Sequence, residues 1–370
     1  MTVMRKVLVG VAAGAMLFGL AACDAPSTEG GDEGAAATVE SVGISMPTRE
    51  LERWINDGEG LKALLEEDGF TADLQYAEND PDTQISQIQN QIAAGVDVLV
   101  VAAIDGSVLA PTLQDAADAG ITVIAYDRLI NDTENVDYYA TFDNYKVGQL
   151  QGEFIRDNLD LDNATGPFNL EPFAGSPDDN NAKFFFSGAW DVLQPYIESG
   201  VLVVPSGKSP ATNDDWATIG IQGWESSGAQ DEMDNRPAAF YTGGATVDVV
   251  LSPNDSLAQG IAESLASAGY APGSYILTGQ DADKASVINI LADKQTMSVW
   301  KDTRLLGAQV FGMIQSLKNG TEVEINDTET YDNGVKVVPS FLIAPEVVVK
   351  GDVQTKLIDS GFLKASDVGL

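Results

Sequence analysis

Short apolar runs alternate with longer amphipathic segments along most of the chain, from Val39 onward. In the first half the apolar runs are residues 42–46, 72–76, 96–103 and 121–126. The almost continuous run at 96–103 is typical of a strand that is buried on both faces of a parallel sheet. Gly69, Gly95 and Gly120 each end a helical segment just before the next strand. This pattern predicts a βαβαβα order with parallel strands.

The same alternation restarts after an apolar run at residues 138–142. Further strands are expected at residues 167–173, 201–204, 247–252, 274–279 and 296–300. We therefore predict an α/β protein with two doubly wound, Rossmann-like lobes, for which 370 residues are long enough. Ligands of doubly wound folds bind outside the carboxyl ends of the strands, so the cleft between the two lobes is the expected site.

The N-terminus has the pattern of a targeting segment. Arg5 and Lys6 precede an apolar run at residues 7–22, which is short for a membrane span and suits the core of a signal peptide. The run ends in Leu-Ala-Ala-Cys, which resembles a bacterial lipoprotein box, in which Cys23 is acylated and becomes the mature N-terminus. The alternative is an ordinary signal peptide with an incidental cysteine.

Residues 1–23 are thus expected to be a lipoprotein signal peptide, and residues 24–38 a flexible tether. The tether contains no aliphatic residue larger than alanine, so it cannot bury a core. We expect the globular body outside the cytoplasmic membrane, in the periplasm or at the cell surface, attached through its lipid alone.

Composition excludes several classes of function. The chain has 56 acidic and 20 basic residues, a formal net charge of −36 that would repel the phosphates of a nucleic acid. It has no histidine, which removes Ser-His-Asp and Cys-His catalysis and histidine-based metal sites. Its single cysteine, Cys23, cannot form an internal disulfide. We expect neither a metal nor a cofactor.

Polar or aromatic side chains follow many of the predicted strands. They are Asp127-Arg128, the run 176–181, Asn254-Asp255, Gln280-Asp281 and Lys301-Asp302. Arg53-Trp54 lies near the end of the first strand. Aspartate accepts hydrogen bonds, arginine and lysine donate them and asparagine does both, so the set suits the hydroxyl groups of a sugar. The apolar C–H face of a sugar ring packs on flat aromatic rings, and Trp54 and Trp224 are candidates for such a sandwich.

Each of these residues also has a structural alternative. Aspartate and asparagine just after a strand commonly cap the following helix or form ion pairs in loops. A parallel fold directs all strand ends to one edge, however, and five polar strand ends at one edge favour a shared binding site.

The sequence resembles the multiple-monosaccharide and xylose-binding proteins of ABC importers, within the type I periplasmic binding protein fold. The similarity runs from about residue 42 to the C-terminus. The motifs are Ser-Met-Pro-Thr at 45–48, Glu-Arg-Trp at 52–54, Tyr-Asp-Arg at 126–128, Ala-Thr-Phe-Asp-Asn at 140–144, Asp-Asn-Asn at 179–181, Gly-Gln-Asp at 279–281 and Asn-Gly-Val-Lys at 333–336.

The resemblance implies a set of sugar contacts. They are Arg53, Trp54, Asp127, Arg128, Asp179, Asn181, Trp224, Asn254, Asp281 and Lys301. Trp224 is the weakest match, because residues 209–227 depart from the family pattern. The resemblance also implies a three-stranded hinge, with crossings near Phe142, Lys301 and Val338. The lobes would then comprise residues 39–142 plus 302–337 and residues 143–301 plus 338–370.

The function implied is that of a monomeric capture protein. Its two lobes close on a monosaccharide of the xylose, glucose, galactose or arabinose class and present it to the permease of an ABC transporter. The ATPase and permease are separate chains, because this sequence has no phosphate-binding Gly-Lys-Ser/Thr loop and no membrane span after its signal segment.

Two other functions are considered. A glycoside hydrolase could use Asp127 and Asp281, but neighbouring Arg and Lys residues favour ionised carboxylates that are unfit as general acids. A sugar sensor, which presents its loaded form to a chemoreceptor or a sensor kinase, would use the same binding residues. A cytoplasmic regulator with the same effector fold is excluded by the signal segment and by the lack of DNA-binding helices.

Overall fold

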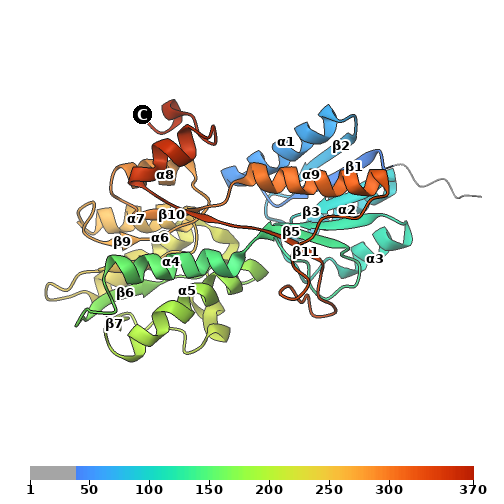
Figure 1. The fold of residues 1–370 in the computed structure, drawn as a ribbon. Coiled ribbons are helices and arrows are strands. Elements are labelled where there is room, and N and C mark those ends of the chain that lie inside the picture. The colour runs from blue at the N-terminus through green and yellow to red at the C-terminus, as the bar shows by residue number, and fades with distance from the viewer. Residues whose placement is uncertain (1–38) are drawn as a thin grey trace, which may run out of the picture. The chain divides into compact units, whose positions relative to one another are not determined.

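The computed structural model describes residues 39–370, so the predicted signal peptide, Cys23 and the tether lie outside the described residues. A six-stranded sheet forms the first lobe (Figure 1). In spatial order its strands are β11 (Ser340–Ile343), β5 (Tyr138–Phe142), β4 (Thr122–Tyr126), β3 (Val98–Val101), β1 (Ser41–Met46) and β2 (Thr71–Tyr76). Every neighbouring pair is parallel, as the sequence predicts.

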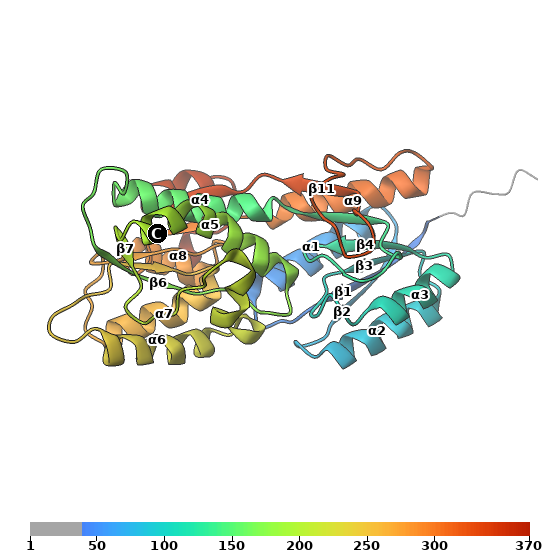
Figure 2. The ribbon, with the colours of Figure 1, turned by 90° about the horizontal axis from the view of Figure 1, so that it is seen from below.

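Helices cover both faces of this sheet. On one face lie α1 (Glu52–Glu67) and α9 (Thr303–Asn319), and on the other lie α2 (Pro81–Ala94) and α3 (Ala110–Asp118) (Figure 2). Val98 and Val100 of β3 belong to the first of the two hydrophobic clusters, whereas Leu99 and Val101 belong to the second. Because successive side chains of a strand point to opposite faces, this sandwich explains the unbroken apolar run at residues 96–103.

The second lobe has a smaller parallel sheet. Its strands, in spatial order, are β7 (Leu202–Val203), β6 (Phe168–Pro172), β8 (Val249–Leu251) and β9 (Ile276–Leu277). Beside it, β10 (Met297–Trp300) pairs antiparallel with β12 (Glu346–Val349). Its helices are α4 (Asn144–Asn158), α5 (Asn180–Glu198), α6 (Ser226–Phe240), α7 (Asp255–Ser267) and α8 (Lys284–Leu291). Shorter helical turns span Asn213–Ile219, Gln222–Trp224, Lys350–Asp352, Val353–Ile358 and Ala365–Asp367.

The chain crosses between the two lobes three times. The first crossing leads from β5 to α4 at Phe142, and the second from β10 to α9 at Lys301, both near the predicted positions. The third was expected near Val338, which is wrong. Ser340–Ile343 still pairs with β5 in the first sheet, and only Glu346–Val349 joins the second lobe. The reason is that the apolar side chains of β11 complete the open edge of the first sheet before the chain leaves it.

In the part of the chain from residue 39 onward, none of the helices combines the length and the apolar character that a membrane crossing requires.

Candidate ligand-binding site

Residues from both lobes meet around one narrow cavity. All ten residues expected to contact a sugar line it, together with Leu51, Phe185 and Gln280. The volume that the centres of water molecules can occupy in it is about 30 Å³, so the lining side chains lie close together. Side chains that now meet across the cavity therefore move apart when a ligand much larger than water enters.

Arg53 is the centre of a charge network on the first lobe's side of the cavity. It lies in the first turn of α1 and is 8% exposed. Its Nη2 lies 3.0 Å from Asp57 and 2.8 Å from Asp127, and its Nη1 lies 3.4 Å from Asp281 of the second lobe. Because a buried charge is costly without partners, these three carboxylates determine where the guanidinium sits.

The two first-lobe partners of Arg53 differ in their acidity. Burial tends to raise the pKa of Asp127, but Arg53 and Lys301 outweigh that effect and hold the pKa below its usual value. Burial raises the pKa of Asp57 to about 6, although Arg53 lies beside it. Asp127 is thus ionised at neutral pH and is a strong hydrogen-bond acceptor. Sequence reasoning missed Asp57, whose position four residues after Arg53 places both on one face of α1.

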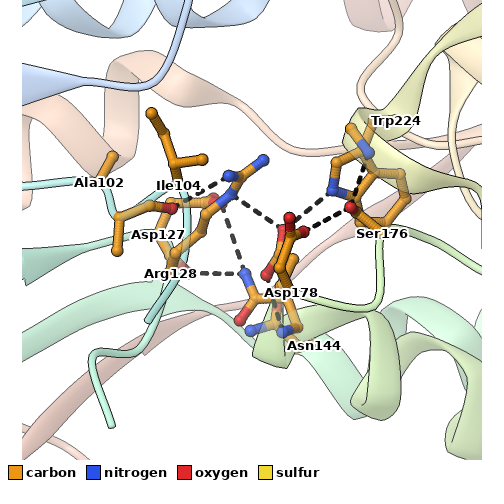
Figure 3. Close-up of polar contacts among 12 residues, drawn as sticks. Ala102, Ile104, Asp127, Arg128, Asn144, Ser176, Asp178 and Trp224 are labelled. Carbon is orange, nitrogen blue, oxygen red and sulfur yellow. Dashed lines mark hydrogen bonds and ion pairs between the residues drawn. The ribbon is translucent and has the colours of Figure 1, made fainter. Parts of the chain in front are cut away.

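Arg128, Asp179 and Trp224 form a second group, which also joins the lobes (Figure 3). Arg128 follows β4 in the first lobe, and its Nε lies 2.9 Å from Oδ2 of Asp179. Among residues 39–370 the Nε–H of Arg128 nevertheless has no aligned hydrogen-bond acceptor, so this contact is an ion pair. Trp224 donates from Nε1 to the same Asp179 oxygen at 3.1 Å. Burial raises the pKa of Asp179 against the opposing effect of Arg128.

Asn181 links the lobes through uncharged hydrogen bonds. Its Nδ2 donates to the backbone carbonyl oxygen of Asp127 at 2.7 Å, and its Oδ1 accepts from the hydroxyl of Tyr139 at 3.1 Å. The side chain of Asp179 accepts from the backbone N–H of Asn181, so Asp179 also caps α5. The capping role and the place at the cavity therefore coexist in Asp179.

Lys301 and Asn254 complete the polar lining. Lys301 lies in the second crossing, is 2% exposed, and places its Nζ 2.9 Å from Asp281. Asn254 caps α7, since its Oδ1 accepts from the backbone N–H of Leu257 at 3.0 Å. The structural alternative considered for Asn254 is thus realised, and the residue still borders the cavity.

Both candidate tryptophans are buried at the cavity. The guanidinium carbons of Arg53 and Arg128 lie 4.3 and 5.0 Å from the Trp54 ring centroid. Trp54 therefore packs against cations, a favourable cation–π arrangement. The Trp224 ring packs on Gly175 so closely that a Cβ atom there would lie 1.9 Å from it. Phe185 meets Trp224 edge-on, with ring centroids 6.3 Å apart.

Three lining residues are absent from the set that the resemblance implies. Phe185 follows Asn181 by one turn of α5, so the two side chains share a helix face. Leu51 precedes Arg53 directly before α1, and Gln280 adjoins Asp281 at a predicted strand end. Each of the three lies one, two or four residues from a predicted contact residue. That closeness in the sequence is the signal that could have identified them.

Comparison with known proteins agrees with this architecture. The family model described as "Periplasmic binding protein domain" matches residues 42–322. The multiple sugar-binding periplasmic receptor of Rhizobium radiobacter is 49% identical over 90% of this chain and 93% of its own length. The D-xylose-binding periplasmic protein of Escherichia coli is 36% identical over 88% and 92%. These relatives are named as binding proteins and not as enzymes.

Solved structures show the same fold. An ABC transporter solute-binding protein of Clostridium phytofermentans, with bound β-D-glucose, aligns with a TM-score of 0.84 and 46% identity over 89% of this chain and all of its own. A carbohydrate transporter solute-binding protein of Chloroflexus aurantiacus, in complex with D-glucose, aligns with a TM-score of 0.80 and 35% identity over 89% and 98%. With its two α/β lobes and three crossings, this chain belongs to the periplasmic binding protein family and has the type I form of its fold.

Proposed function

We propose that this chain captures a monosaccharide in the cavity between its lobes and delivers it to the permease of an ABC importer. The observation that carries the proposal is the composition of the cavity. Its lining has three cations, three carboxylates, two asparagines and a glutamine beside aromatic rings. Alternating donors and acceptors next to flat apolar surfaces suit a sugar ring, which has hydroxyl groups at its edge and C–H groups on its faces.

The relatives support the ligand class. Two structures with at least 35% identity to this chain have bound glucose, and a curated relative is named for D-xylose. The ten residues carried over from the family motifs are the proposed sugar contacts.

The lobes act as a clamp in this proposal. The three crossings serve as the hinge, and the ion pairs Arg53–Asp281 and Arg128–Asp179 link the two sides of the cavity. A sugar inserted between the lobes exchanges some of these contacts for hydrogen bonds to its hydroxyl groups and becomes buried. The permease then recognises the closed form. The proposed lobes are residues 39–142 plus 302–343 and residues 143–301 plus 346–370.

Isothermal titration of the purified body with D-xylose, D-glucose, D-galactose and L-arabinose tests the ligand class. We expect saturable binding of at least one sugar, with a smaller radius of gyration in solution scattering when that sugar is added. Absence of binding to any member of a wider monosaccharide panel would contradict the proposal. Delivery is tested by whether the loaded protein stimulates ATP hydrolysis by the reconstituted permease and ATPase.

A sugar sensor is the second candidate, because the Rhizobium radiobacter relative is named a receptor. The same cavity would serve both roles. Deletion of the permease distinguishes the two roles. A sensor still elicits a sugar response in the cell, whereas a protein that serves only import no longer supports sugar uptake.

We also propose that Cys23 carries the lipid anchor, which holds the body at the outer face of the membrane. This rests on the lipoprotein-box pattern in residues 20–23. A Cys23→Ser variant should be released from the membrane fraction into the medium or periplasm, as immunoblotting of cell fractions would show. Continued membrane attachment of that variant contradicts the proposal, and Ser27→Ala in the tether is the matched control.

A further inference from the structure

Two buried polar atoms of residues that line the cavity have neither a hydrogen-bond partner nor an ion-pair partner within residues 39–370. They are the Nε1 of Trp54 and the Oε1 of Gln280. Leaving such an atom unpaired costs about 1–3 kcal/mol, and native structures contain few of them. A donor and an acceptor at one cavity therefore point to a ligand that supplies the missing partners.

Gln280 differs from the other buried glutamines. The amides of Gln84, Gln91, Gln151 and Gln295 each hydrogen-bond to neighbouring backbone or side-chain atoms. These four hold elements together. The amide oxygens of Gln91 and Gln295 are unpaired as well, but neither residue lines the cavity. Gln280, which is 1% exposed, is one of the lining residues of the cavity, and its amide oxygen accepts from none of the described residues.

The backbone around Gln280 is firmly held. Its carbonyl oxygen accepts from the backbone N–H of Asp255 at 3.0 Å. The N–H of Asp281 donates to the carbonyl oxygen of Val299 at 2.9 Å, and the N–H of Val299 donates to that of Gly279 at 2.9 Å. These bonds fix the main chain on both sides of Gln280. Its side chain is therefore attached to a rigid backbone, which a selective contact with a ligand requires.

The charged groups of the cavity already have partners. Arg53 and Lys301 pair with Asp281, Arg53 also pairs with Asp127, and Arg128 pairs with Asp179. A neutral amide differs from them, since it offers a hydrogen bond without another charge to be compensated.

We propose that the side chain of Gln280 accepts a hydrogen bond from one hydroxyl group of the bound monosaccharide and so helps to determine which sugar is retained. The inference rests on the proposed function and adds a specificity-determining residue outside the contacts that the family resemblance implies. The unpaired N–H of Trp54 is the complementary donor to a sugar oxygen. A sugar that lacks the hydroxyl read by Gln280 leaves the amide oxygen unpaired in the closed cavity.

The experiment compares the wild type with Gln280→Met, which keeps the side-chain length and removes the strong acceptor. Titration calorimetry measures the affinity of each for the tightest-binding monosaccharide and for its deoxy analogues at every ring position. Gln280→Met should bind the parent sugar about 10- to 100-fold more weakly. At one ring position, the wild type should discriminate against the deoxy analogue, and Gln280→Met should bind parent and analogue equally.

Gln259→Met is the matched control, since Gln259 lies on α7 and does not line the cavity. It should bind every sugar as the wild type does. Gln280→Leu, measured in the same way, replaces Gln280→Met if that variant does not fold.

Three results separate the hypotheses. Unchanged affinities in Gln280→Met, or an equal loss for the parent and every analogue, overturn the role of Gln280 while the proposed function stands. Loss of discrimination at a single position supports it. A wild type that binds no monosaccharide at all defeats the proposed function itself.

Discussion

At the scale of single residues, the cavity is organised by charges that compensate one another. Arg53 contacts carboxylates from both lobes, and Lys301 shares Asp281 with it. Partners of this kind hold the buried charges in place until a ligand enters and replaces some of them with its own hydrogen bonds.

Asp127→Ala tests an ionised acceptor of the site. The change removes a carboxylate that is ionised at neutral pH and leaves Arg53 with one partner fewer. We expect a loss of about 2–4 kcal/mol in sugar affinity, because one partner of a buried, charge-assisted contact is lost. Titration calorimetry measures it. Asp118→Ala, on the exposed side of α3, should leave the affinity unchanged, and an equally small effect of Asp127→Ala would mean that the site is misplaced.

At the scale of elements, close packing of α4 and α5 determines where Asn181 and Phe185 lie. Gly148 of α4 and Gly188 of α5 allow the two helices to touch at the backbone. A Cβ at Gly148 would lie 1.8 Å from the carbonyl oxygen of Phe185, and one at Gly188 would lie 2.0 Å from that of Tyr145. Since α4 begins at the first crossing, this contact connects the hinge to the cavity wall.

Gly188→Ala should therefore destabilise the protein by about 1–3 kcal/mol, because the backbones must separate. Intrinsic helix propensity acts in the opposite direction, favouring alanine by about 1 kcal/mol. Gly312→Ala on α9 provides the control, since a Cβ there meets no atom within 4 Å, and it should be neutral or stabilising. Urea unfolding measures both. Equal stabilities of the two variants would show that the helices are not in the tight contact described.

At the scale of the whole molecule, ion pairs connect the lobes outside the cavity as well. Glu52 of α1 pairs with Lys284 of α8, beside Asp367 near the C-terminus. Both Glu52 and Lys284 are about one-third exposed or more, so water screens the pair. Glu52 directly precedes Arg53 in α1, so we expect this pair to stabilise the closed arrangement of the lobes.

Lys284→Glu should speed sugar dissociation about 2- to 5-fold, as expected for the loss of a surface pair worth up to ~1 kcal/mol. The double variant Glu52→Lys/Lys284→Glu should restore the wild-type rate, since it re-forms the pair with reversed charges. Stopped-flow fluorescence at low ionic strength measures these rates. Lys350→Glu breaks a pair with Asp293 inside the second lobe and should change nothing. A double variant as fast as Lys284→Glu would contradict a role for the pair in closure.

Much of the fold and of the site followed from local patterns. The run at residues 96–103 predicted a doubly buried strand, and glycines marked helix ends. The third crossing was misplaced, because the hydrophobic pattern of residues 338–343 is compatible both with a strand of the first sheet and with the start of the second lobe. Only the pairing of Ser340–Ile343 with β5 distinguishes the two.

What the sequence determined alone was what periodicity, composition and motif spacing encode: two doubly wound lobes, no histidine chemistry, and polar strand ends at one edge. What only the tertiary structure decided was which side chains pair across that edge. Arg53 and Asp281 are 228 positions apart, and no local pattern records their 3.4 Å contact. Asp57 is likewise defined by burial and by partners that the folded first lobe brings together, and the unpaired amide oxygen of Gln280 by its surroundings in the fold.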